Sequence, residues 1–154
     1  MGASLTAEGV PVKRTAHATH PAHLKRAAAL DVLERRWLRS AERCDWASAL
    51  EVANLIVERN PGESTGWIWQ SVSLHKCNRT VEARERLLAA AERFPNMAII
   101  YYHLACYACQ LDHFAESSQW WTKALKSGNS ELLTMMAANE EDLKPLWQSL
   151  GLPG

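Results

Sequence analysis

The chain has 154 residues, of which 47% are hydrophobic and seven are tryptophan, a composition typical of one folded domain with a buried core. Seventeen Lys and Arg residues balance seventeen Asp and Glu residues, so the charge gives no argument for a nucleic acid or an anionic membrane as partner. No segment approaches the roughly 18 apolar residues that a membrane-spanning helix needs. The first residues lack the apolar region of a secretory signal, so the four cysteines indicate reduced thiols and a cytoplasmic protein.

Residues 1–21 are mostly small or polar and include two prolines, which predicts a flexible N-terminal tail. Beyond them, hydrophobic residues recur at helical spacing in six successive stretches, and no sustained alternation of period two predicts a strand. The six stretches are 30–41, 49–57, 67–74, 83–91, 101–108 and 114–125. The sequence therefore predicts a single all-α domain over residues 22–150.

The breaks between these helices are evenly spaced. The interval from Pro61 to Pro95 is the same as that between two small residues within helical stretches, Ser71 and Ala105. This interval, about 34 residues, is the period at which paired helices recur in tetratricopeptide repeats. On these residues the chain resembles the tetratricopeptide repeat (TPR) family, with units at about 30–63, 64–97 and 98–131.

The resemblance implies a helical-hairpin solenoid, a right-handed superhelix of about three repeats with a C-terminal capping helix. Trp37 stands where the other two units have Ser71 and Ala105, which leaves the close packing of the first helix pair open.

A cap over residues 132–150 is also expected on physical grounds, because the last repeat of a stack leaves an apolar face that terminal elements must cover. Ser130 and Asn139 are predicted N-caps of its helices, and Pro145 fits only near a helix start. The stripe predicted to dock the cap consists of Leu143, Leu146, Trp147 and Leu150.

His103, Cys106 and Cys109 in the segment HLACYAC allow three interpretations: a metal site, a redox pair, or small residues packed on a helix. Residues three apart drift by about 60° per step around a helix, and a zinc site needs about four converging ligands. A redox pair normally lies at a helix N-terminus, whereas these cysteines lie in the middle and end of one. Packing is therefore favoured.

The remaining histidine cluster, His17, His20 and His23, lies around Pro21 and is not expected to hold a physiological metal. The sequence contains no phosphate-binding glycine loop, no His-Glu-x-x-His and no nucleophile elbow. We expect neither a cofactor nor enzymatic activity.

In the TPR family the first helix of each unit lines a concave groove. The resemblance places nine residues of the second and third units on this surface: Ile68, Val72, His75, Lys76, Ile99, Tyr102, Cys106, Cys109 and Gln110. With Lys76 as its one cation, the set does not predict a clamp for a terminal carboxylate. It predicts a mildly apolar groove for a peptide or helix of a protein partner.

The resulting function is that of an interaction module, as an adaptor, a scaffold or a chaperone-like protein. The alternative is a self-associating structural subunit, for instance a homodimer. Trp120 and Trp121 are adjacent and cannot both face the core, so one of them is expected either at an interface or against the cap.

Overall fold

A computed structural model describes residues 21–152. The predicted flexible tail lies outside these residues except for Pro21, which begins the first helix. The described part is entirely helical and consists of α1 (Pro21–Glu42), α2 (Trp46–Arg59), α3 (Ser64–Lys76), α4 (Thr80–Arg93), α5 (Ala98–Gln110), α6 (Phe114–Ser127), α7 (Ser130–Ala138), the 3-10 helix η1 (Glu141–Leu143) and α8 (Lys144–Ser149). Within this range no helix combines the length and the hydrophobicity that crossing a bilayer requires.

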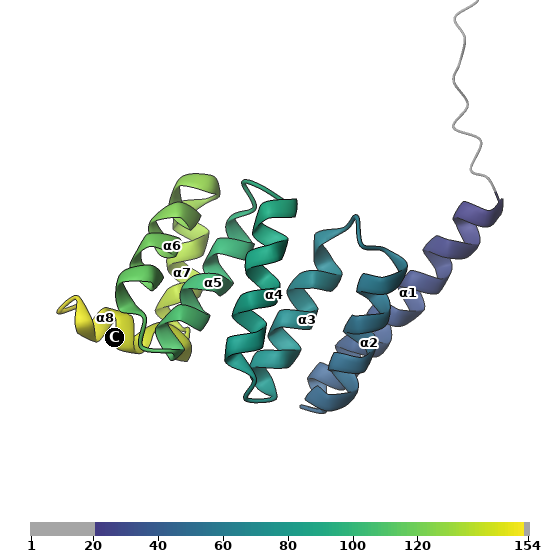
Figure 1. The fold of residues 1–154 in the computed structure, drawn as a ribbon, viewed down its shortest axis with the longest axis horizontal. Helices are drawn as coiled ribbons and strands as arrows, with labels where there is room; N and C mark the ends of the chain where they lie inside the picture. The colour runs from purple at the N-terminus through teal and green to yellow at the C-terminus, as the bar shows by residue number, and fades with distance from the viewer. Residues whose placement is uncertain (1–20, 153–154) are drawn as a thin grey trace, which may run out of the picture.

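The helices form hairpins that stack side by side (Figure 1). The pairs are α1 with α2, α3 with α4, and α5 with α6, and successive pairs meet through α2 against α3 and α4 against α5. This arrangement confirms the predicted all-α helical repeat. After the third pair, α7 packs on α6, η1 turns back onto α5, and α8 packs on both α5 and α6.

The turns inside the three helix pairs have the same backbone conformation and recur at the repeat period of the sequence. Cys44, Asn78 and Asp112 each follow closely after the first helix of a pair, with φ angles of 56°, 60° and 61°. In each turn the next N–H donates at 2.9 Å to a carbonyl five positions earlier, namely that of Ser40, Leu74 or Ala108. A left-handed residue with this hydrogen bond ends a helix tightly and starts the second helix of the hairpin at a fixed angle.

Trp37 fits the first unit because its ring lies across the junction with the second. The indole N–H donates to Ser73 Oγ at 3.0 Å, and the ring stacks on Trp69 with centroids 4.2 Å apart. The equivalent contact one unit later joins the hydroxyls of Ser71 and Tyr107 at 3.1 Å. At the first junction the large Trp37 thus reaches the small Ser73, whereas at the second junction the small Ser71 meets the large Tyr107.

Two glycines mark close approaches between helices. A Cβ at Gly66 would lie 2.8 Å from Ile56 Cγ2 and 3.1 Å from the Val57 nitrogen, so α3 approaches the α2 backbone closely. Gly128 ends α6, but its backbone is extended and not left-handed. A Cβ there would lie 2.5 Å from Ala98 Cβ, so the glycine is required by proximity to the start of α5.

The caps of the C-terminal helices differ from the predictions by one position. Asn129, not Ser130, caps α7 by accepting a hydrogen bond from the Leu132 N–H at 3.0 Å. The prediction for Asn139 was wrong: it ends α7, and the Glu140 carboxylate accepts from the N–H of Asp142 in η1. In each case the residue next to the predicted one has the extended backbone that a cap needs.

The predicted docking stripe of the cap is present in part. Leu143 and Leu146 are fully buried, and Trp147 is partly buried against Trp121 with ring centroids 5.4 Å apart. Leu150 is 51% exposed because α8 ends at Ser149 and the chain turns away. Pro145 lies in the first turn of α8, where its missing N–H costs no helical hydrogen bond.

Candidate peptide-binding groove

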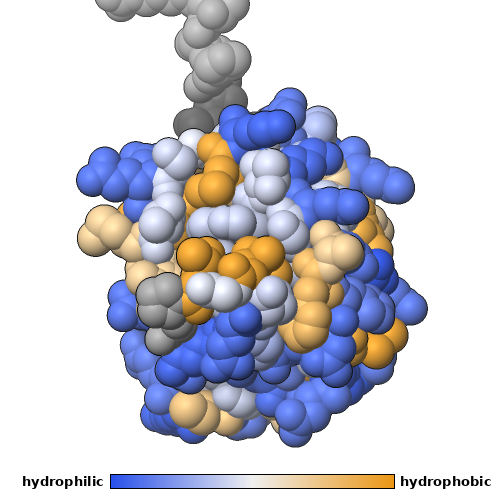
Figure 2. Space-filling model, turned by 90° about the vertical axis from the view of Figure 1, so that its left-hand side faces the viewer, coloured by the Kyte–Doolittle hydropathy of each residue, from blue (hydrophilic) through white to orange (hydrophobic). Residues whose placement is uncertain are grey.

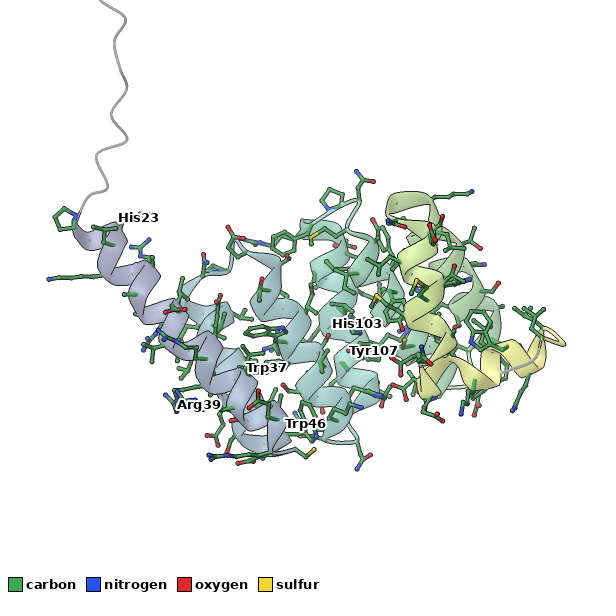
Figure 3. The ribbon with its side chains drawn as sticks, turned by 180° about the vertical axis from the view of Figure 1, so that it is seen from behind. His23, Trp37, Arg39, Trp46, His103 and Tyr107 are labelled. Atoms are coloured by element: carbon green, nitrogen blue, oxygen red, sulfur yellow. The ribbon has the colours of Figure 1, made fainter. Side chains whose placement is uncertain are left out.

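The residues predicted to line the groove come from α3 and α5, as the TPR resemblance implied. Figure 3 views the stack from the side on which α1, α3, α5 and α7 lie in front, with Trp37, His103 and Tyr107 labelled on it. This concave face has two parts with different exposure. We call the part formed by α1 and by α3 up to His75 the open half, with Lys76 at its edge, and the part formed by α5 together with His75 the covered half.

Residues 139–152, which we call the C-terminal segment, lie over the covered half. Tyr102, Cys106 and Cys109 are each 2% exposed or less, although their positions in the repeat predict a groove surface. The cover consists of η1 and α8, which both pack on α5. Contact of these three residues with a partner stays a prediction, and it requires the C-terminal segment to move.

Polar contacts hold the C-terminal segment across two units. Asp142 Oδ2 lies 2.8 Å from His75 Nε2 on α3, and the Gln110 amide of α5 donates to the Asp142 carbonyl at 2.8 Å. The other ring nitrogen of His75 lies 2.9 Å from Thr80 Oγ1, so both nitrogens have partners that orient the ring. The hydrogen bond with His75 lowers the pKa of Asp142 against the opposing effect of burial, and the charge of Lys76 acts in the same direction as His75.

Apolar contacts complete the interface. Leu143 and Leu146 are 0% exposed and belong to the same buried cluster as Tyr102, Cys106 and Cys109. The Tyr102 hydroxyl donates to Glu140 Oε2 at 3.4 Å, at the edge of this cluster. Completely burying two leucine side chains stabilises the docked state by about 1.5–3 kcal/mol each before entropy is counted.

The open half remains accessible. Leu38 on α1 is 47% exposed, and Val72 on α3 is half-buried over the cluster that contains Trp37. Ile68 on α3 is half-buried over the neighbouring cluster, as is Ile99 at the start of α5, in the covered half. Lys76 is exposed at the end of α3. The open half thus presents apolar side chains on both of its helices, with Lys76 at its edge.

The cysteine thiols and the His103 imidazole near the groove are held in their neutral forms. Burial raises the pKa of Cys106 well above its ordinary value and raises that of Cys109, so both thiols stay protonated at neutral pH. Burial lowers the pKa of His103 to about 4, which leaves the imidazole neutral between Tyr102 and Tyr107. Within residues 21–152 no three His, Cys, Asp or Glu side chains converge as metal ligands. His17 and His20 lie outside the described residues, and His23 is exposed on α1.

The adjacent tryptophans of α6 both have partners. Trp120 stacks on Tyr101 with centroids 5.7 Å apart and donates to Glu116 Oε1 at 3.1 Å. Trp121 packs against Tyr102 and against Trp147 of α8. Contact with the cap, one of the two expectations for this pair, therefore applies to Trp121.

The two ends of the stack carry different surfaces. At the C-terminal end, which faces the viewer in Figure 2, hydrophobic side chains gather around a cleft of about 350 Å³ between α6, α7 and α8, lined by Trp121, Leu125 and Trp147. Next to it, Leu132 and Met135 of α7 are 53% and 64% exposed. At the N-terminal end, the hollow between α1 and α2 is polar and lined by Arg36, Arg39 and Arg43, among others.

The groove residues that sequence reasoning missed belong to the C-terminal segment. From the sequence, Leu143 belongs to the docking stripe of the cap, and Glu140 and Asp142 have no predicted role in the groove, so their location against α5 and α3 was not predicted. No local sequence pattern predicts that location, because it depends on the direction in which the chain leaves α7.

Comparison with known proteins supports this fold. The chain is similar to the TPR2B domain in a solved structure titled "TPR2B-domain:pHsp70-complex of yeast Sti1", with a TM-score of 0.67 and 17% identity over 79% of this chain and 96% of that one. At the level of sequence, no family model and no curated protein matches the chain. The protein therefore has the TPR fold, established from structure.

Proposed function

We propose that this protein is a non-enzymatic protein–protein interaction module that binds a peptide or helix of a partner in its concave groove, as an adaptor, a scaffold or a chaperone-like protein. The observation that carries the proposal is the covered half, which already holds a stretch of polypeptide through His75, Gln110 and a cluster of apolar side chains. A surface that accommodates its own chain in this way has the hydrogen-bonding groups and the apolar area that peptide recognition uses. The similar TPR2B domain was solved in a complex, according to its title with pHsp70.

The open half offers a partner its first contact. Leu38 of α1 and Val72 of α3 occupy the same position in successive units, and the stacked rings of Trp37 and Trp69 belong to the cluster beneath this surface. A rigid apolar surface costs a partner little reorganisation, and such preorganisation raises affinity.

The test is affinity capture from native lysate with two matched variants of α1. Leu38→Glu places a charge in the open half, whereas Val32→Glu places one on the same helix at a similarly exposed residue, 51% against 47%, that is six positions away and on another face. Proteins retained by the wild type and by Val32→Glu but lost by Leu38→Glu are groove partners. Equal retention by all three chains, with unchanged circular dichroism, would contradict binding in the open half.

Self-association is the second candidate, and the ends of the stack favour it. Val32 occupies the position that Gly66 occupies in the second unit, where it faces the preceding helix α2, yet no pair precedes α1 in the described residues. The opposite end exposes Leu132 and Met135, and acidic residues lie nearby while arginines line the first end. Complementary charge and apolar surface would let the end of one copy meet the start of another.

Sedimentation analysis separates the two candidates. A mass that is a multiple of 17.3 kDa, reduced to 17.3 kDa by Val32→Glu or Met135→Glu and not by Leu38→Glu, would establish the structural subunit. A single 17.3 kDa species at all concentrations would exclude it.

The remaining expectations are consistent with either candidate. We propose no enzymatic activity, no cofactor and no nucleic acid as partner, since the chain is electrically balanced and the described clefts collect no catalytic set. We also propose a cytoplasmic location, on the argument from reduced cysteines.

A further inference from the structure

The C-terminal segment indicates which kind of peptide the covered half takes. Its contacts follow one another along the chain: Asp142 meets His75 and Gln110, and the next residue, Leu143, enters the buried cluster that contains Tyr102, Cys106 and Cys109 of α5. Leu146, three positions on, enters the same cluster. Side chains three apart in helical turns lie on one side, so η1 and α8 direct both leucines toward α5 while the carboxylate reaches α3.

The segment's location differs from that of an element whose only role is to close the stack. A closing element covers the apolar face of the last helix. Here α8 does contact α6, the last helix of the repeats, but the segment also contacts α5 and reaches His75 in the unit before, and Leu132 and Met135 of α7 stay 53% and 64% exposed. The segment therefore closes part of the end of the stack and, in addition, buries residues in the groove.

From these contacts we propose that the covered half is a binding site for an internal acidic–leucine segment of a partner protein, of the pattern Asp-Leu-x-x-Leu, and that the C-terminal segment is a built-in competitor for it. The proposal rests on the proposed function and names the ligand of the groove. The ligand is an internal segment because the carboxylate at His75 is a side chain, and the main chain at this point is bound through its carbonyl by Gln110.

Tethering makes the competitor effective. A segment joined to its site acts at an effective concentration of the order of millimolar, so a free peptide of equal intrinsic affinity binds poorly until the tethered copy is weakened. The apparent affinity for a free peptide falls in proportion to the fraction of molecules with an open site.

The experiment is a fluorescence-anisotropy titration of full-length protein with a labelled synthetic peptide of residues 139–152. We expect the Leu143→Ala/Leu146→Ala chain to bind this peptide at least tenfold more tightly than the wild type does. Asp142→Asn, which keeps both leucines, is the milder second variant and should bind it several-fold more tightly. Circular dichroism checks that each variant stays helical.

Specificity is tested on both sides of the contact. The Leu143→Ala/Leu146→Ala chain should bind a peptide that carries Asp142→Asn several-fold more weakly than it binds the wild-type peptide. Adding His75→Ala to that chain should weaken binding of the wild-type peptide but not of the Asp142→Asn peptide, because both changes remove the same hydrogen bond. His23→Ala, an exposed histidine on α1, is the matched control and should leave binding unchanged.

One result overturns the proposal: folded variants, including Asp142→Asn, that bind the peptide no more tightly than the wild type. A peptide insensitive to both Asp142→Asn and Leu143→Ala would overturn the stated pattern. Either failure is distinct from failure of the proposed function, because capture that depends on Leu38 reports on the open half alone.

Discussion

The two halves of the concave face place residues at the same position of the repeat in different environments. Leu38, Val72 and Cys106 occupy equivalent positions in successive units, yet Leu38 is 47% exposed, Val72 is half-buried and Cys106 is 2% exposed. All three lie at the same turn of the first helix of a unit. The difference arises outside the repeats, in a C-terminal segment that folds back over α5 and leaves α1 uncovered. The position in a repeat therefore determines the direction of a side chain, and its neighbours determine its exposure.

The largest expected contrast between the halves is in stability. Leu143→Ala removes a fully buried side chain from the covered half and should lower the free energy of unfolding by about 2–5 kcal/mol. Leu38→Ala in the open half should change it by less than about 0.5 kcal/mol. Urea denaturation measures both. Similar losses for the two variants would mean that the open half is covered in solution.

Thiol reactivity reports the cover directly. Cys44 is exposed, whereas Cys106 and Cys109 are buried beneath the C-terminal segment, where burial also raises their pKa. We expect Cys44 to react with a chromogenic disulfide on the order of a hundredfold faster than either buried thiol, because the buried ones react only through local opening. Mass mapping of labelled peptides assigns the rates.

Leu143→Ala/Leu146→Ala should raise the rates of Cys106 and Cys109 and leave that of Cys44 unchanged. Rapid labelling of all the thiols in the wild type would show that the segment is not docked.

The anchor between Asp142 and His75 should have a defined pH dependence. The folded-state pKa of Asp142 lies below its ordinary value of 3.8, so its contribution to stability is present above that value and is lost as the pH falls through the lowered pKa. At pH 7 Asp142→Asn should cost about 1–2 kcal/mol, a magnitude reduced by partial exposure to water.

Urea denaturation of the wild type and of Asp142→Asn from pH 7 to pH 3 should show this cost shrinking at the acid end. A constant difference across the range would mean that the carboxylate is not held in its charged form by His75.

The smallest expected effect lies in the turns, where the units differ least. Cys44 has a φ of 56°, a conformation that costs an ordinary side chain about 1–2 kcal/mol, whereas asparagine tolerates it. Cys44→Gly should therefore stabilise the first unit by about 0.5–1 kcal/mol after the entropy of glycine is counted. Asn78→Gly, at the same turn of the second unit, should change stability by less than about 0.5 kcal/mol. Thermal unfolding compares them, and equal effects would contradict the assignment of strain to the cysteine.

The fold was predictable because its signals are local and repeat. Helical spacing, breaks at Pro61 and Pro95, and small residues at fixed offsets each depend on neighbours within one or two turns, and their recurrence at one period predicts the stack. Trp37 was not resolved by such signals, since its place depends on Trp69 and Ser73 in another unit.

The chain's own sequence determined which faces its helices bury, where they end and that they stack, because these follow from the spacing of apolar residues and from the conformations that each residue allows. Tertiary structure alone decided that Tyr102, Cys106 and Cys109 are covered and that Asp142 meets His75, residues separated by 67 positions. That outcome depends on the direction in which the chain leaves α7 and on contacts between residues far apart in the sequence, which no local pattern encodes.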